Sequence, residues 1–371
     1  MAGHRSSAGP LAAMYTALIV YASLYPFTGW QTPGVSMWGF LVLPFPHWWT
    51  GFDLVSNLLG YLPLGTLLFG ALVRSGLRES RAAVIAVATG AALSFTMETL
   101  QNFLPQRVPS NVDLALNIVG SLCGVLIGIA LHRLGWMQRW QAVRERWFID
   151  RSAGGLALLV LWPVGLLFPA PVPFGLGQVW PRLRDAAAGW LEGSAAAPWF
   201  DAWLQGDADV SPLSPPSELV AVALGLAAPC LVAFAISRPG WRRALLALGA
   251  VAIGFAAMTL STALNFAPEH ALAWRTPVAM AAVVACMALV MLLAWVPRRV
   301  AAGVGLMVLA ALVAVIAQAP PDAYFSESLQ AWEQGRFIRF HGAAQWVGWL
   351  WPYVAMAWLL ARVASRDAGQ P

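Results

Sequence analysis

The sequence predicts an all-α, polytopic membrane protein with about ten transmembrane helices. Its composition is the first reason: 59% of the 371 residues are hydrophobic, only 11% are charged, and the mean hydropathy is +0.67. Soluble domains carry roughly 25% charged residues, so a soluble chain of this kind could not cover itself with polar groups. The second reason is a regular series of long apolar runs.

A helix that crosses the hydrocarbon core needs about 20 apolar residues. The runs of suitable length are bounded by Arg, Pro or polar residues, and they lie at 11–28, 54–73, 82–104, 113–132, 153–170, 217–237, 243–263, 276–296, 300–318 and 341–362. The first run follows a short Arg-bearing start, as a signal peptide does, but the later runs favour a retained helix.

The loops between the runs predict the orientation. With the N-terminus in the cytoplasm, 16 of the 22 basic residues lie in cytoplasmic loops and 13 of the 17 acidic residues lie outside. This distribution follows the positive-inside rule, so both termini are predicted to be cytoplasmic. The net charge of +5 therefore reflects membrane orientation, and no nucleic-acid partner is predicted.

The longest predicted external loop covers residues 171–216. It is rich in Pro, Ala, Trp and Asp, and a short amphipathic helix is expected around Arg182 to Leu191. The acidic residues Asp201, Asp207 and Asp209 lack the Gly turn and terminal Glu of a calcium loop, so they are interpreted as a solvated face.

The three cysteines, Cys123, Cys230 and Cys286, all lie within apolar runs. No CxxC pair and no His at metal-ligand spacing accompanies them, so they are interpreted as small packing residues. The sequence predicts no disulfide, no metal and no cofactor.

Two internal repeats divide the chain. Asp53-Leu54-x-x-Asn57-x-x-Gly60-x-Leu62 recurs sixty residues later as Asp113-Leu114-x-x-Asn117-x-x-Gly120-x-Leu122. A weaker repeat matches residues 102–107 with residues 265–270, with Ser261 in place of Glu98 and Thr276 in place of Asp113. We therefore predict a four-helix unit at 1–152, a degenerate copy at 153–297, and two terminal helices within 298–371.

Ionisable and other polar residues are costly inside a membrane helix, so those near the helix ends of the first unit are candidates for function. They are Asp53, Asn57, Glu98, Gln101, Arg107, Ser110, Asp113 and Asn117, which we call the polar cluster. Three carboxylates face one Arg. This imbalance is compatible with Arg107 bridging two carboxylates, with one carboxyl staying protonated, or with a bound cation.

Part of the polar cluster is also compatible with ordinary helix capping. Ser110 or Asn111 is expected to cap the helix that begins there, with Asp113 in its first turn. Pro63 and Gly65 are expected to kink or unwind the second run. The row Gly120, Gly124, Gly128 is predicted to let another helix approach closely.

The order of these residues resembles the VanZ-like family, which is named for an accessory protein of glycopeptide resistance. The resemblance covers about residues 11–131, and it is carried by Asp53, Asn57, Pro63, Gly65, Glu98, Gln101, Pro105, Arg107, Ser110, Asp113, Asn117 and Gly120. It implies a protein of the bacterial inner membrane and cell envelope, with a link to antibiotic resistance through tolerance of lipid-anchored glycopeptides such as teicoplanin. The six additional runs set this chain apart from the shortest members of that family.

Three functions follow as hypotheses. In the first, the polar cluster binds the headgroup of an envelope lipid or lipid-linked compound at the outer leaflet, or moves it. In the second, Glu98 or Asp113 acts as the general base of an intramembrane enzyme, although the sequence contains no GxSxG, HExxH or P-loop motif. In the third, the degenerate half is a scaffold for another envelope complex. The sequence predicts neither the ligand nor the oligomeric state.

Overall fold

The computed structural model describes residues 8–25, 27–32, 36–42, 51–149, 152–191, 213–266, 271–319 and 338–364. Within these ranges the chain is helical and contains no strand, with one isolated β-bridge between Phe148 and Ser237. Asp201, Asp207 and Asp209 lie outside the described residues. The side chain of Asp53 is likewise not described.

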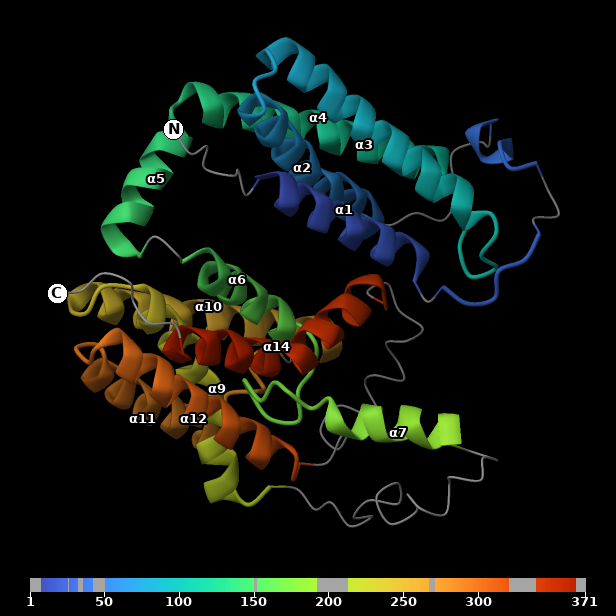
Figure 1. Cartoon of the computed structure of the whole chain (residues 1–371). Helices are drawn as coiled ribbons and strands as arrows, with labels where there is room; N and C mark the ends of the chain where they lie inside the picture. The colour runs from blue at the N-terminus through green and yellow to red at the C-terminus, as the bar shows by residue number, and fades with distance from the viewer. Residues whose placement is uncertain are drawn as a thin grey trace. The chain divides into compact units, whose positions relative to one another are not determined.

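The chain divides into two compact units, unit 1 at Met1–Val143 and unit 2 at Arg144–Pro371 (Figure 1). Unit 1 contains α1 (Ala8–Leu24), the short 3-10 helix η1 (Gly39–Val42), α2 (Gly51–Arg74), α3 (Glu79–Gln101) and α4 (Asn111–Arg133). The division falls within α5 (Trp136–Trp147). Unit 2 contains α6 (Ala153–Leu166), α7 (Trp180–Leu191), α9 (Pro215–Ile236), α10 (Trp241–Phe266), α11 (Pro277–Leu293), α12 (Arg298–Ile316) and α14 (Ile338–Ala364).

The ten predicted apolar runs coincide with ten of these helices, and the protein is a polytopic membrane protein. Seven of them, α2, α3, α4, α9, α10, α12 and α14, are long and apolar enough to cross a membrane. The apolar helices α1, α6 and α11 are shorter. Helix α6, with 14 residues, ends at Leu166 rather than at residue 170, because Phe168 precedes Pro169 and a residue before proline disfavours the helical region.

Two further elements bear on the sequence predictions. The expected amphipathic helix around Arg182 to Leu191 is present as α7. Helix α5 was not predicted, because its Arg-rich segment contains no long apolar run.

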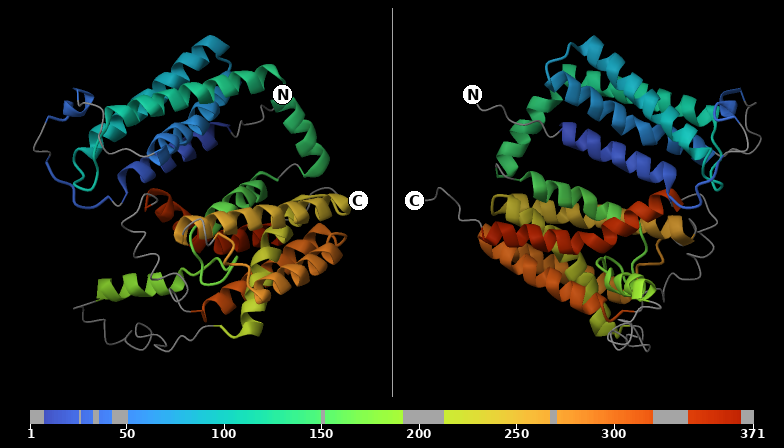
Figure 2. Two further views of the ribbon diagram at one scale, coloured as in Figure 1. Left: turned by 180° about the vertical axis from the view of Figure 1, so that it is seen from behind. Right: turned by 45° about the vertical axis from the view of Figure 1, so that its right-hand side comes forward.

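In unit 1, α2 and α4 lie against each other with almost no side chain between them. A Cβ atom on Gly120 or Gly124 would collide with the carbonyl oxygen of Leu58 or Leu62, and one on Gly65 would collide with that of Ser121. The prediction that the glycine row of α4 serves close packing is therefore confirmed. The helices of unit 1 run side by side in both views (Figure 2).

Helix α2 continues through Pro63 from Gly51 to Arg74, so the expectation of an unwound segment there is wrong. The missing N–H of proline removes one helical hydrogen bond. The contact with α4 supports the next turn, where the Thr66 hydroxyl donates to the Leu62 carbonyl (3.1 Å) and to the Gly124 carbonyl (2.8 Å).

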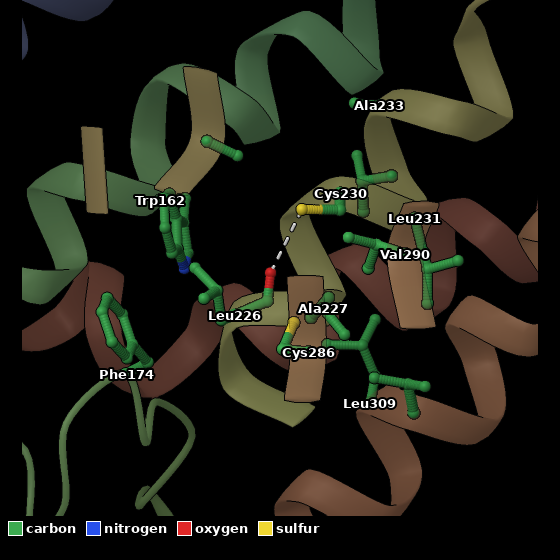
Figure 3. Packing of buried hydrophobic residues seen from close by; sticks show 14 of the residues in the cluster. Trp162, Phe174, Leu226, Ala227, Cys230, Leu231, Ala233, Cys286, Val290 and Leu309 are labelled. Carbon is green, nitrogen blue, oxygen red and sulfur yellow. Dashed lines mark hydrogen bonds between the residues drawn. The ribbon is translucent and has the colours of Figure 1, made fainter. Parts of the chain in front are cut away.

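Helix α9 is the centre of unit 2. It packs against α6, α10, α11 and α12, and 78% of its apolar window is buried, compared with 22–39% for the other long apolar helices. Cys230 of α9 and Cys286 of α11 are buried in this core near Trp162, and the Cys230 thiol donates to the Leu226 carbonyl (Figure 3). Both cysteines are packing residues, as predicted.

The helix pairings of unit 1 recur in unit 2. Helix α1 packs against α2 and α3, and these two pack against each other and against α4. Helix α6 packs in the same way against α9 and α10, which pack against each other and against α11. Helices α12 and α14 extend unit 2, since α12 packs on α9 and α14, and α14 packs on α6.

Candidate functional site

The polar cluster gathers where α3 ends and α4 begins. Glu98 and Gln101 lie in the last turn of α3, and both are 4% exposed. Ser110 is the N-cap of α4, and its hydroxyl accepts hydrogen bonds from the amides of Val112 (3.2 Å) and Asp113 (3.3 Å). The predicted capping role of Ser110 is thus confirmed.

Glu98 joins the two helix ends. Its carboxylate Oε2 accepts a hydrogen bond from the backbone N–H of Ser110 at 2.8 Å. A carboxylate beside the first turn of a helix is stabilised by the positive end of the helix dipole. Glu98 is therefore held near the amino end of α4 rather than directed at lipid.

The neighbouring polar side chains attach α3 to the end of α1. The Gln101 amide donates to the carbonyl of Ser23 at 3.2 Å, and the Arg107 guanidinium donates to the carbonyl of Tyr25 at 2.5 Å. Both carbonyls lie at the C-terminal end of α1, where helical carbonyl groups lack partners within the helix. Gln101 and Arg107 therefore hold the end of α1 beside the end of α3 and the loop that follows it.

A buried polar path continues from Glu98 toward the middle of unit 1. The Asn117 amide donates to the Ser94 hydroxyl at 2.9 Å, and both residues are buried. One turn deeper, Ser121 is fully buried. The Asn117 Oδ1 and Ser121 Oγ atoms have no hydrogen-bond partner among the described residues. At 1.5 Å per residue, Ser121 lies roughly 15 Å from the start of α4, about half the thickness of the hydrocarbon core.

Three members of this path were missed in the sequence: Ser94, Ser121 and Tyr61. Tyr61 is 5% exposed and lies within interaction distance of Ser94 and Glu98. Each of the three is four residues from a predicted site residue on the same helix: Tyr61 from Asn57, Ser94 from Glu98 and Ser121 from Asn117. Residues four apart share a helix face, so this spacing was the available signal.

The remaining members of the polar cluster are less closely integrated. Asn57 is half-buried on α2 and has no hydrogen-bond partner among the described residues. Asp113 is half-buried in the first turn of α4. Asp53 lies in the first turn of α2, with its side chain outside the described residues. In the part of the chain that the structure describes, no group of three or more His, Cys, Asp or Glu could hold a metal ion.

Replacing Ser121 with alanine is expected to raise the free energy of unfolding of unit 1 by on the order of 1 kcal/mol, because a buried hydroxyl without a partner is removed. Ser94→Ala is the matched comparison. It is expected to lower the same quantity by about 1 kcal/mol, because Asn117 loses its acceptor. Detergent-driven unfolding of the purified chain measures both, and equal effects of the same sign would contradict this difference.

The polar cluster lies within the part of the chain that matches a known family. Residues 10–132 match the model of the family described as VanZ/LLP1. The match covers α1 to α4 with every residue of the polar cluster, and it confirms the resemblance drawn from the sequence. Comparison with curated proteins and with solved structures gave no match.

Proposed function

We propose that unit 1 binds the polar headgroup of an envelope lipid or lipid-linked compound, or moves it, at the outer leaflet of the bacterial inner membrane. The observation that carries this proposal is the buried polar path from Glu98 to Ser121, in which Asn117 Oδ1 and Ser121 Oγ have no partner among the described residues. Burying such atoms costs about 1–3 kcal/mol each. A bundle that carries this cost along the path below Glu98 has hydrogen-bonding capacity for a polar ligand.

The chemistry of the polar cluster favours a ligand with both anionic and donor groups. Arg107 suits a phosphate or carboxylate, and the carboxylates of Glu98 and Asp113 suit an amine or a sugar hydroxyl. Binding is favoured over catalysis, because the Ser110 hydroxyl is engaged in capping α4 and the sequence contains no GxSxG, HExxH or P-loop motif. Headgroup binding would influence susceptibility to teicoplanin, whose lipid anchor places it at the same surface.

The proposed orientation places both termini in the cytoplasm. It rests on the Arg-rich loops, and it puts the start of α2, the end of α3 and the start of α4 at the external surface. The polar cluster then faces the outer leaflet.

We also propose that α6, α9, α10 and α11 are a degenerate copy of α1 to α4. The matching helix pairings support this, and so do the hydrogen bonds at the equivalent helix ends. Asn265 donates to the Ser261 carbonyl (2.7 Å) as Asn102 donates to that of Glu98 (3.2 Å). Thr276 caps α11 as Ser110 caps α4, whereas the sequence alignment had placed it opposite Asp113. This copy has no counterpart of Glu98, so the ligand site is assigned to unit 1.

The test is a deletion strain complemented with wild type, Glu98→Gln or Arg107→Ala at equal protein level. Envelope lipids, lipid-linked precursors and their leaflet distribution are measured, together with susceptibility to teicoplanin and vancomycin. Each variant is expected to weaken complementation about tenfold, the effect of losing one charge-assisted contact of about 1.4 kcal/mol. Glu79→Gln is the control, because Glu79 lies on the same helix and makes only exposed ion pairs with His132 and Arg133.

Unchanged lipid chemistry with a precursor accumulating on one leaflet, or with altered teicoplanin susceptibility alone, supports binding or transport. A chemically altered lipid that wild type corrects and Glu98→Gln does not would replace this proposal with an intramembrane enzyme. Full complementation by both variants would show that the polar cluster is architectural.

A further inference from the structure

A buried arginine joins two chain reversals at one end of unit 2. Arg243, in the first turn of α10, is 0% exposed. Its Nη2 donates to the carbonyls of Phe234 (2.7 Å) and Ser237 (3.1 Å), where α9 ends. Its Nη1 donates to the carbonyls of Val296 (2.6 Å) and Ala294 (3.4 Å), just after α11. The guanidinium therefore clamps the α9–α10 turn to the α11–α12 turn.

The two clamped turns form one side of a pocket of 490 Å³. It is lined by Glu145, Phe148, Ile149, Arg238, Pro239 and Arg298. The opposite side is the segment after α5, which is held by hydrogen bonds from the Ile149 amide to the Ile236 carbonyl (3.0 Å) and from the Arg238 amide to the Trp147 carbonyl (3.4 Å). Gly240 adopts a φ of 109° in the α9–α10 turn, and its amide donates to the Ala294 carbonyl. The pocket walls are thus fixed by backbone contacts.

The charges at this pocket do not balance. Among the described lining residues, Arg238 and Arg298 are basic and Glu145 alone is acidic, and the buried Arg243 lies close enough to Arg298 for their charges to repel. Among the described residues, no ion pair is recorded for Arg238, Arg243 or Arg298, whereas the recorded pairs join Glu79 to His132 and Arg133. Helix α12 also begins at Arg298, which adds the positive end of its dipole. A net positive site beside a low-dielectric core attracts an anion.

We propose that this pocket binds the phosphate of an anionic membrane lipid. Arg238 and Arg298 supply two planar donors that fit phosphate oxygens, while Phe148, Ile149 and Pro239 form an apolar wall beside them. The pocket lies where α9 ends and α12 begins, and both helices are long and apolar enough to cross a membrane. Basic pockets between the ends of such helices are typical sites for anionic lipids. This site is separate from the polar cluster of unit 1, and the proposal does not depend on the function of that cluster.

The experiment uses the purified full-length protein in a neutral detergent. Phosphatidylglycerol, phosphatidylcholine or inorganic phosphate is titrated, and binding is read by native mass spectrometry and by the thermal unfolding midpoint. Phosphatidylglycerol is expected to bind wild type and raise the midpoint, and phosphatidylcholine is expected to do neither. The double variant Arg238→Gln/Arg298→Gln is expected to bind phosphatidylglycerol about 10- to 100-fold more weakly, because two charge-assisted contacts are lost.

The control is Arg139→Gln/Arg146→Gln. It removes the same charge from exposed positions of α5 that do not line the pocket, and its affinity is expected to stay within about twofold of wild type. Arg238→Lys/Arg298→Lys keeps the charge and is expected to recover most of the binding, which separates lost charge from misfolding. Equal affinities for the glutamine variant and the control would overturn the proposal. Binding of inorganic phosphate as tight as that of phosphatidylglycerol would assign the pocket to a soluble phosphate and overturn the lipid assignment.

Discussion

Gly120→Ala is expected to destabilise unit 1 by about 1–3 kcal/mol, whereas Gly60→Ala leaves its stability nearly unchanged. The two glycines occupy the same position of the sixty-residue repeat. An added Cβ at Gly120 meets the Leu58 carbonyl of α2, and a close-packed contact of backbone with backbone has no side chain that can move aside. An added Cβ at Gly60 meets nothing within 4 Å, and alanine is the better helix former.

The measurement is the rate of thiol labelling at Cys123, the one cysteine of unit 1, as detergent denaturant is raised. Mapping the labelled peptide separates Cys123 from the buried Cys230 and Cys286 of unit 2. Faster labelling in Gly120→Ala alone is the expected result. Equal labelling rates of Cys123 in the two variants would show that a methyl group at Gly120 does not destabilise the contact between α2 and α4.

Arg243→Ala is expected to lower the free energy of unfolding of unit 2 by about 3 kcal/mol or more. The side chain donates four hydrogen bonds to backbone carbonyls, and a bond from a charged donor contributes about 1.5–3 kcal/mol. Removing the guanidinium leaves buried carbonyls at the ends of two helices without their donor.

Arg242→Ala provides the matched comparison, since Arg242 is adjacent, half-buried and placed over the ring of Trp241 at 5.5 Å. A loss of about 1 kcal/mol or less is expected for it. Detergent-driven unfolding, followed by the tryptophan fluorescence that changes as the core around Trp162 opens, measures both variants. Similar losses of unfolding free energy in the two variants would mean that the hydrogen bonds from Arg243 to the two turns do not stabilise unit 2.

The membrane helices could be predicted because hydropathy and the helical period act locally. The runs at residues 54–73 and 113–132 differ from α2 and α4 by a few residues at each end. The central place of α9 could not be predicted, because its run is as apolar as its neighbours and apolarity alone does not distinguish a core-facing helix from a lipid-facing one. Helix α5 was missed because its 12 residues are Arg-rich and contain no long apolar run.

Residues of the site could be predicted where their type alone indicates a role. Contacts that depend on the conformation of a turn could not be predicted. Glu98 and Asn117 were identified from the cost of polar groups in a membrane, and Ser110 from capping. The contact of Glu98 with the Ser110 amide depends on the conformation of residues 102–110. The sequence presents Arg243 only as one of the charges that predict orientation. Residue types do not show which backbone carbonyl groups will accept its hydrogen bonds.

The Arg243 clamp also constrains the order in which the chain can be completed during synthesis. Two of its acceptors, the Phe234 and Ser237 carbonyls, precede it, but those of Ala294 and Val296 follow it by 51 and 53 residues. A nascent chain that has inserted α9 and α10 therefore carries a charged group with half of its partners unmade. The clamp is therefore complete only after residues 294 and 296 have been synthesised, and a shorter nascent chain lacks its contribution to the stability of unit 2.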